Sequence, residues 1–81
     1  SKDAQNSLGF MYFEGKGVSR DLIEAYAWFQ LSANADYDQA RLNSSIVEAN
    51  LDNSEMQKAR EKAEQYILEY ASDSELVDSN E

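Results

Sequence analysis

The stretch over residues 3–36, DAQNSLGFMYFEGKGVSRDLIEAYAWFQLSANAD, decides the fold. Gly15 and Gly17 interrupt it, and glycine supplies the positive φ with which many helices end. Asp21 then opens a capping-box pattern with Glu24, which marks the start of a second helix. Apolar residues on both sides of this loop recur at helical spacing rather than at the two-residue period of a strand. The stretch therefore predicts two helices joined by a glycine turn, over about residues 3–14 and 21–34.

Two further helices follow in the second half of the chain. Asp52 and Glu55 repeat the capping-box pattern, which predicts a helix over residues 53–72. Asp36 and Asp38 place negative charge where a third helix, over residues 37–50, begins, and this suits the positive end of its dipole. Because no segment alternates with period two, we expect an all-α fold without a sheet.

The first and third helices carry matching apolar stripes. When the sequence is shifted by 36 positions, one stripe of the first helix aligns with one stripe of the third: Ala4, Leu8, Met11 and Gly15 with Ala40, Ser44, Val47 and Leu51. A second set behaves in the same way: Asn6, Phe10 and Phe13 on Leu42, Ile46 and Ala49. A helix with two apolar faces is expected between neighbours on both sides. A repeat of this length with paired helices is typical of a solenoid. We therefore predict antiparallel helix pairs stacked as a short right-handed α/α superhelix.

The second and fourth helices differ from these two. The second has a broad apolar arc: Leu22, Ala25, Tyr26, Trp28, Phe29 and Ala33. The fourth has a single apolar stripe, and the opposite face of the helix is charged. The stripe consists of Met56, Ala59, Ala63, Tyr66, Ile67 and Tyr70. One stripe and one charged face are what the last helix of a stack requires. We therefore expect this helix to cap the C-terminal end, followed by an acidic tail over residues 73–81.

The composition excludes several kinds of site. The 81 residues include no cysteine and no histidine, so disulfides, thiolate nucleophiles, zinc-finger ligand sets and imidazole bases are absent. Asp36-Tyr37-Asp38 begins like a calcium loop, but Arg41 stands where that loop needs glycine and Val47 where it needs glutamate. The carboxylates fall on polar helix faces or at helix starts, where capping and solvation explain them. We expect no metal, no cofactor and no catalytic residues.

The formal net charge of −9 is concentrated in the second half of the chain. Residues 1–35 carry three basic and four acidic side chains, whereas residues 36–81 carry four basic and twelve acidic ones. Nucleic-acid binding needs a basic surface, so this charge disfavours a nucleic-acid partner. It also disfavours an anionic membrane surface, and no apolar run approaches the roughly 18 residues of a membrane-spanning helix. The partner expected is a protein or peptide.

Several residues of the first helix pair occur in the order found in one family. They are Ala4-Gln5, Leu8-Gly9, Met11-Tyr12, Gly15-Lys16-Gly17-Val18, Asp21, Ala25, and Trp28 through Ser32-Ala33. In this order they resemble the Sel-one-like repeat, a relative of the tetratricopeptide repeat. The resemblance covers one full repeat, residues 1–36. Residues 37–72 resemble the degenerate helix pair and cap that often end such arrays, since Ser44-Ser45 replaces Leu-Gly.

The resemblance implies structural roles for several of these motif residues. Gly9 is expected to let another helix approach its backbone closely, and Val18 to fill the gap between the two helices. The family usually has glycine after the second helix, where this chain has Asp36. Family membership implies an adaptor or scaffold role in protein assembly and signalling, often in bacteria, and names no partner.

The aromatic residues are the candidates for partner binding. Trp28 is expected in the core, or with one edge exposed to a ligand. Phe10 and Phe13 either pack inside the stack or, with Asn6, grip a peptide on a concave surface, as repeat proteins commonly do. A second hypothesis is self-association, because the first helix has Leu8, Met11 and Tyr12 on one side and both phenylalanines on the other. This N-terminal edge would then meet an earlier repeat or form a homodimer.

Two function classes therefore stand. The first is a non-catalytic protein–protein interaction module, and the second is a structural or self-association element. An enzyme is not expected, because no constellation of residues supports one.

Overall fold

The computed structural model describes residues 1–71, and within them it is built of helices without a strand. The elements are α1 Lys2–Glu14, α2 Leu22–Asn34, α3 Asp38–Glu48, α4 Asn53–Tyr66 and the π-helical η1 Ile67–Ala71. The prediction of an all-α fold with four helices is confirmed. The third helix ends two residues earlier than predicted, and the fourth changes to a π-helix after Tyr66. The acidic tail over residues 73–81 lies outside the described residues.

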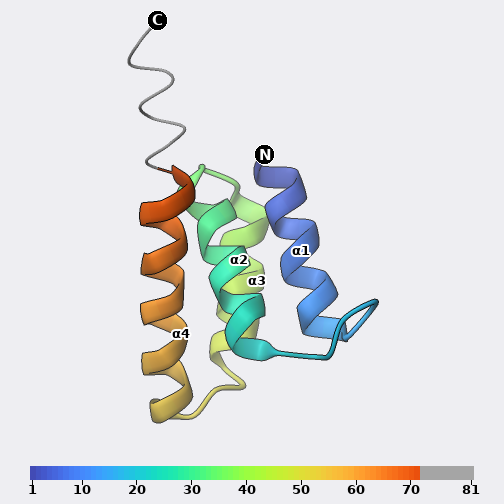
Figure 1. The fold of residues 1–81 in the computed structure, drawn as a ribbon, viewed down its shortest axis with the longest axis vertical. Coiled ribbons are helices and arrows are strands. Elements are labelled where there is room, and N and C mark those ends of the chain that lie inside the picture. Colours follow the sequence, from blue (N-terminus) through green and yellow to red (C-terminus); the bar gives the residue numbers. More distant parts are fainter. Residues whose placement is uncertain (72–81) are drawn as a thin grey trace, which may run out of the picture.

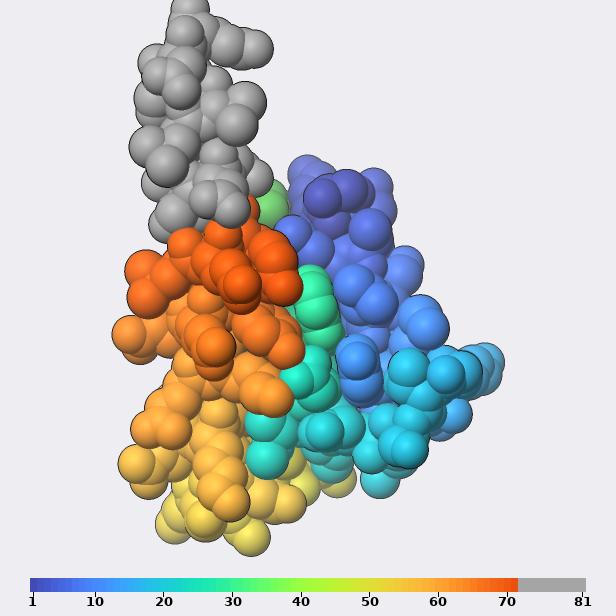
Figure 2. All heavy atoms as spheres, in the orientation of Figure 1, coloured from blue at the N-terminus to red at the C-terminus, as the bar shows by residue number. Residues whose placement is uncertain are grey.

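Consecutive helices run antiparallel, and α2 is the central one (Figure 1). Helices α1, α3 and α4 all pack on α2. In Figure 1, α1 and α4 flank α2 and α3 lies behind it. The space-filling view shows the same order on the surface, with atoms of α2 forming the strip between α4 and α1 (Figure 2). Two helix pairs thus stack as the predicted superhelix requires.

The glycine turn forms as predicted. Gly15 has a φ of 72° and closes α1, and its amide donates to the carbonyl of Met11 at 2.8 Å. Gly17 has a φ of 78°, in the left-handed region that favours glycine. The carboxylate of Asp21 accepts from the amides of Ile23 and Glu24, both at 3.1 Å, and so starts α2. These local signals position the two helices of the first pair.

The start of α3 differs from the prediction. Asp36 has a φ of 64° and is the residue outside glycine with a positive φ among those described. It therefore takes the left-handed conformation that favours glycine, at the position where the resemblance to Sel-one-like repeats leads one to expect glycine. The residue at the N-cap is Tyr37, whose side chain makes no capping hydrogen bond. Asp38 is the first residue of the helix, where its charge meets the helix dipole as expected.

One of the two predicted capping boxes is complete. At the start of α4, Asp52 accepts from the amide of Glu55 at 2.7 Å, and the Glu55 carboxylate accepts from the Asp52 amide at 2.9 Å. At the start of α2 the prediction was half wrong. Asp21 caps the helix, but Glu24 turns to tertiary partners instead of returning to the Asp21 amide.

The core lies along α2 and is made largely of small side chains. Ala25, Ala27, Ala40 and Ala59 are fully buried, Ala63 is nearly so, and around them lie the larger core residues: Tyr26, Phe29, Val47 and Met56. Small residues let helix backbones approach, and this explains how three helices can pack on one. The hydroxyl of Ser32 donates to the carbonyl of Lys2 at 2.7 Å and ties the two ends of the first pair together.

The repeat-motif residues are covered to different degrees. Gly9, Ala25 and Ala33 are buried, whereas other motif residues are half-buried: Leu8, Tyr12, Gly15, Val18 and Trp28. Ala4, Gly17 and Asp21 are exposed. On α3 the matching stripe is buried as predicted, with Ala40, Ser44 and Val47 inside. The expectation that both apolar faces of α1 and α3 are covered is wrong for residues 1–71, since only one face of each packs on α2.

Candidate functional site

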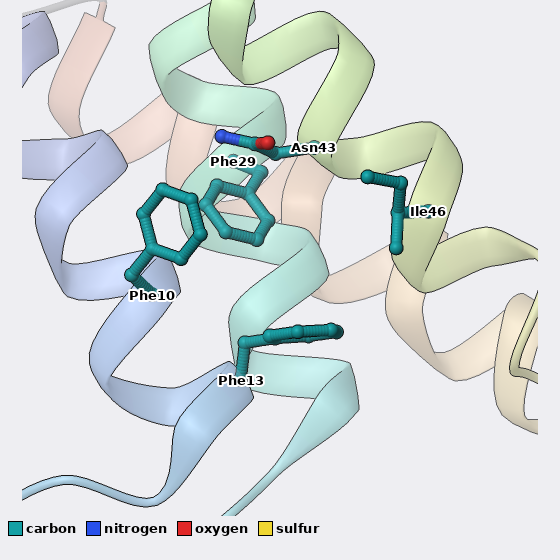
Figure 3. A pocket seen from close by; sticks show the side chains of 5 residues that line it. All are labelled: Phe10, Phe13, Phe29, Asn43 and Ile46. Carbon is teal, nitrogen blue, oxygen red and sulfur yellow. The ribbon is translucent and has the colours of Figure 1, made fainter.

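An apolar groove lies between α1 and α3, with α2 as its floor. Its lining residues come from all three helices: Phe10, Phe13, Phe29, Asn43 and Ile46 (Figure 3). We call this set, together with the neighbouring exposed Leu42, the α1–α3 groove. Between these side chains is a hollow of about 20 Å³. This is room for about one water molecule, and a pocket for a small-molecule ligand is usually ten times larger or more.

The floor of the groove depends on Gly9. A Cβ atom at this position would lie 2.5 Å from both Cδ1 and Cε1 of Phe29. Without that atom the Phe29 ring lies directly against the backbone of α1 and is only 1 % exposed. Phe10, the next residue, meets the same ring edge to face, with ring centroids 5.3 Å apart. The expectation that a helix crosses closely at Gly9 is confirmed.

Asn6 has a different place from the one predicted. It was expected on the partner-binding surface beside Phe10 and Phe13, but it is buried, with 8 % of its surface exposed. Its Oδ1 accepts from Nδ2 of Asn43 at 3.0 Å. A buried amide needs such a partner, because leaving it unpaired carries a desolvation penalty. The hydrogen bond between Asn6 and Asn43 therefore links α1 to α3 inside the protein, and we call it the brace. Asn43 also lines the groove.

The two phenylalanines lie on the groove rather than on the N-terminal edge. Phe10 is 38 % exposed and forms one wall, facing Ile46 across the hollow. Phe13 is half-buried, and Arg20 holds it in place. The guanidinium of Arg20 lies 5.9 Å from the Phe13 ring centroid, and its Nε donates to the Phe13 carbonyl at 2.9 Å. The sequence left open whether these rings pack inside the stack or lie on a surface for a partner. In the structure both rings pack partly inside and remain partly exposed.

The opposite wall is the second apolar stripe of α3. Leu42 is 62 % exposed and Ile46 is 54 % exposed. No element among residues 1–71 packs on them. A shift of 36 positions in the sequence aligns Leu42 and Ile46 with Asn6 and Phe10. This repeat predicts that Leu42 and Ile46 face neighbouring helices within a stack. Within the described chain they instead form exposed apolar surface.

The N-terminal edge is therefore a different surface from the one proposed from the sequence. The outer stripe of α1 consists of Ala4, Leu8 and Met11, with Met11 37 % exposed. Tyr12 packs against the core and does not belong to it. The aromatic side chains expected to remain exposed at this edge turn toward α3.

Trp28 lies apart from the groove, on the side of α2 that faces α4. Its ring centroid is 4.9 Å from that of Tyr66 and 5.7 Å from that of Tyr70, with Tyr70 nearly parallel. Its Nε1 donates to Oε2 of Glu24 at 3.2 Å. Trp28 is half-buried in this aromatic cluster, and the structure does not bring it together with Phe10 and Phe13.

Glu24 joins α2 to α4 through a set of contacts that sequence reasoning missed. Besides Trp28, its carboxylate accepts from Nζ of Lys62 at 2.7 Å and from the hydroxyl of Tyr66 at 2.8 and 3.0 Å. The hydrogen bond to Glu24 raises the pKa of Lys62, and burial, followed by the same carboxylate, raises the pKa of Tyr66. The spacing of Lys62 and Tyr66, one helical turn apart, is the sequence signal that points to a shared partner.

Neither a metal site nor a membrane span is found in residues 1–71. No group of three acidic, histidine or cysteine side chains there could hold a metal ion. No helix in this part of the chain is long and apolar enough to cross a bilayer.

Comparison with known proteins agrees with the architecture. The family model of the Sel1 repeat matches residues 2–37. One similar solved structure is c5321, a protective antigen present in uropathogenic Escherichia coli strains, which displays an SLR fold. It superposes with a TM-score of 0.85 at 35 % sequence identity, over 90 % of this chain. This chain spans 16 % of the length of that protein. No curated protein matches the chain.

The family match covers the helix pair and turn that the sequence pattern singled out. It runs from the first residue of α1 to the residue before α3, so it contains the glycine turn, Gly9 and Phe29. Sel1 repeats are generally protein-interaction modules. Residues 2–37 are a Sel1 repeat, and the chain shares the helical-repeat fold of c5321.

Proposed function

We propose that this chain is a non-catalytic protein-interaction module that binds a segment of a partner protein along the α1–α3 groove. The observation that carries the proposal is the cluster of exposed apolar side chains on facing helices: Phe10, Leu42 and Ile46. Contiguous apolar surface on a folded protein usually marks an interaction site. Because the floor is already packed and the brace between Asn6 and Asn43 fixes the two walls, the groove is formed before a partner arrives.

The small size of the hollow supports a protein partner over a small molecule. Binding there relies on the walls and on one inserted side chain, which is how a short segment anchors to a helical surface. The general property of Sel1 repeats points the same way. An adaptor or scaffold role follows if further repeats or domains accompany this one in a longer protein.

The test is selection of peptides from a random displayed library on the immobilised protein, followed by mapping of the bound surface by NMR. Peptides should shift resonances of Phe10, Asn43 and Ile46. Ile46→Asn should abolish binding, and it should leave the fold intact because Ile46 is more than half exposed. Leu68→Asn is the matched control, since Leu68 is 63 % exposed on a helix that does not line the groove. Peptides that map elsewhere and tolerate Ile46→Asn would refute the proposal.

Self-association is the second candidate function, and one observation favours it. The outer stripe of α1 leaves Met11 exposed and Leu8 half-buried, and no element among residues 1–71 covers them. A second copy or another repeat could pack there. Mass measurement in solution over a wide concentration range tests this, with Met11→Asn as the variant. A monomer at all concentrations would remove self-association as a function of the isolated chain.

A further inference from the structure

Helix α4 is held mainly by one neighbour. Together with η1 it packs along α2, and it touches α3 little, although α3 directly precedes it in the chain (Figure 1). Lys62 and Tyr66 donate to the Glu24 carboxylate of α2 at 2.7 Å and 2.8 Å, and the Tyr66 ring lies 4.9 Å from that of Trp28, centroid to centroid. Because these contacts lie on α2, the α2 helix of a second copy of the chain offers α4 the same contacts.

The connection between α3 and α4, residues 49–52, differs from the two connections before it. The α1–α2 turn contains Gly15 and Gly17 with positive φ, and the α2–α3 turn contains Asp36 with a φ of 64°. A residue in that left-handed conformation ends a helix. Residues 49–52 have no positive φ and include neither glycine nor proline. They can therefore become helical without steric obstruction.

Part of this connection already follows the path of a helix. Ala49 has helical backbone angles, with a φ of −63° and a ψ of −17°. The amides of Asn50 and Leu51 donate to carbonyls three residues earlier, at 2.9 Å and 3.2 Å, as in a tightened last turn. The break comes at Asp52, whose ψ of 176° is extended. If Asp52 turns helical, α3 and α4 join into a single helix over residues 38–66, about 44 Å long.

We propose that two copies of this chain form a dimer by exchanging α4 and η1. In each copy α3 and α4 join into the single helix, which carries α4 away from its own α2 and onto the α2 of the other copy. The contacts of α4 with Glu24 and Trp28 are then made between chains. Each copy gives one α4 and receives one, so the assembly closes as a symmetric dimer. The α1–α3 groove is lined by α1, α2 and α3, so the dimer carries two grooves.

The connection decides the balance between monomer and dimer, because the contacts of α4 with α2 are the same in both. The monomer keeps the capping box of Asp52 and Glu55, and the bond from Nδ2 of Asn50 to the Ile46 carbonyl at 2.9 Å. The joined helix replaces these with backbone hydrogen bonds. Exchange requires α4 to leave α2, so the dimer forms when the chain refolds at high concentration.

Two substitutions in or beside the connection shift this balance in opposite directions. Asn53 is the first residue of α4, where proline is favourable, and Asp52 has the extended backbone that precedes a proline. Asn53→Pro therefore fits the monomer, but inside the joined helix it removes a hydrogen bond and clashes with the preceding turn. Asp52→Ala removes the N-cap that the monomer needs. Asp21→Ala is the matched control, since it removes the N-cap of α2 behind a turn that Gly15 and Gly17 keep closed.

The intact chain is unfolded in urea and refolded at low and at high concentration, and light scattering after size exclusion gives its mass. A dimer of the wild type should appear after refolding at high concentration. Asn53→Pro should stay monomeric with an unchanged circular dichroism spectrum. Asp52→Ala should raise the dimer association constant at least about tenfold, because each of the two chains loses one N-cap. Asp21→Ala should leave this constant nearly unchanged.

Cross-linking identifies the element that is exchanged. Gln30 of α2 and Glu64 of α4 line the same hollow, and the chain has no cysteine of its own. Chains with Gln30→Cys and chains with Glu64→Cys are mixed, refolded together at high concentration and treated with a short bismaleimide. In the exchanged dimer the two thiols face each other from different chains, so a covalent dimer should form. In a dimer that associates through α1 the two thiols stay apart.

Several results would overturn the inference, and none of them bears on the α1–α3 groove. If Asp52→Ala is no more dimeric than Asp21→Ala, the connection does not control association, and this comparison holds even if Asn53→Pro fails to fold. A folded Asn53→Pro that dimerises as the wild type does would mean that no joined helix forms. A dimer that gives no cross-link and is lost in Met11→Asn is association through the outer stripe of α1 instead.

Discussion

The contact between Gly9 and Phe29 allows a quantitative prediction for Gly9→Ala. The added Cβ would lie 2.5 Å from two ring carbons and 2.9 Å from a third, about 1 Å inside ordinary contact distance. Overpacking of this kind typically destabilises a core by about 1–3 kcal/mol. Replacing glycine by alanine inside a helix would otherwise stabilise it by about 1 kcal/mol. The net loss expected is therefore up to about 2 kcal/mol, or a melting temperature lower by up to roughly 16 °C.

Thermal and urea unfolding followed by circular dichroism measure this loss. Ser7→Ala is the control, because Ser7 lies on the same helix and is exposed, so this change should leave stability within about 0.5 kcal/mol. A rise in the melting temperature of Gly9→Ala would show that propensity outweighs the contact and that the two helices separate easily.

A double-mutant cycle identifies the cause of the loss. Phe29→Leu removes the ring that the new Cβ would strike, although it destabilises the core by itself. In the Phe29→Leu background, Gly9→Ala should lose its penalty, which gives a coupling of about 1 kcal/mol or more in the favourable direction. Additive effects would mean that the ring is not what alanine meets, and the account of the groove floor would be wrong.

Three further predictions concern other positions. Asp36→Gly should raise stability by about 0.5–1 kcal/mol, because glycine adopts a φ of 64° without strain; a loss in urea unfolding would contradict this. Ser44→Ala should be neutral or stabilise by up to about 1 kcal/mol, since the buried Ser44 hydroxyl has no hydrogen-bond partner, and the same assay would expose a loss. Alkaline pH should destabilise the fold: the pKa values of Lys62 and Tyr66 are raised on folding, so their stabilising contribution is complete below about pH 10 and is lost as pH rises through the folded values. The unfolding midpoint between pH 9 and 11.5 should therefore fall less steeply in Tyr66→Phe than in the wild type, and equal slopes would refute the role of this residue.

Much of the candidate site could be predicted from residue type and spacing. Gly9 was expected at a close helix crossing, and Phe10 and Phe13 were placed together on one side of the first helix. Their exact surroundings could not be predicted, because a residue on an apolar stripe is covered only if another helix is rotated toward it. Asn6 shows the difficulty most clearly. A polar residue beside two aromatics suggests a surface, yet Asn43, distant in sequence, turns it into an internal brace.

The sequence by itself determined the helices, their ends and the repeat. These features depend on hydrogen bonds and side-chain spacings that extend over only a few residues. Gly15 can therefore end a helix, and Asp21 and Asp52 can each start one, without help from distant parts of the chain. The tertiary structure alone decided which apolar stripes remain exposed and which polar groups pair across helices. Glu24 contacts Lys62 and Tyr66 on α4 while the Asp21 amide donates to the Tyr12 carbonyl, and Ile46 is exposed because no helix among residues 1–71 covers its side of α3. Long-range choices of this kind depend on how whole helices are rotated and spaced, which no short sequence pattern specifies.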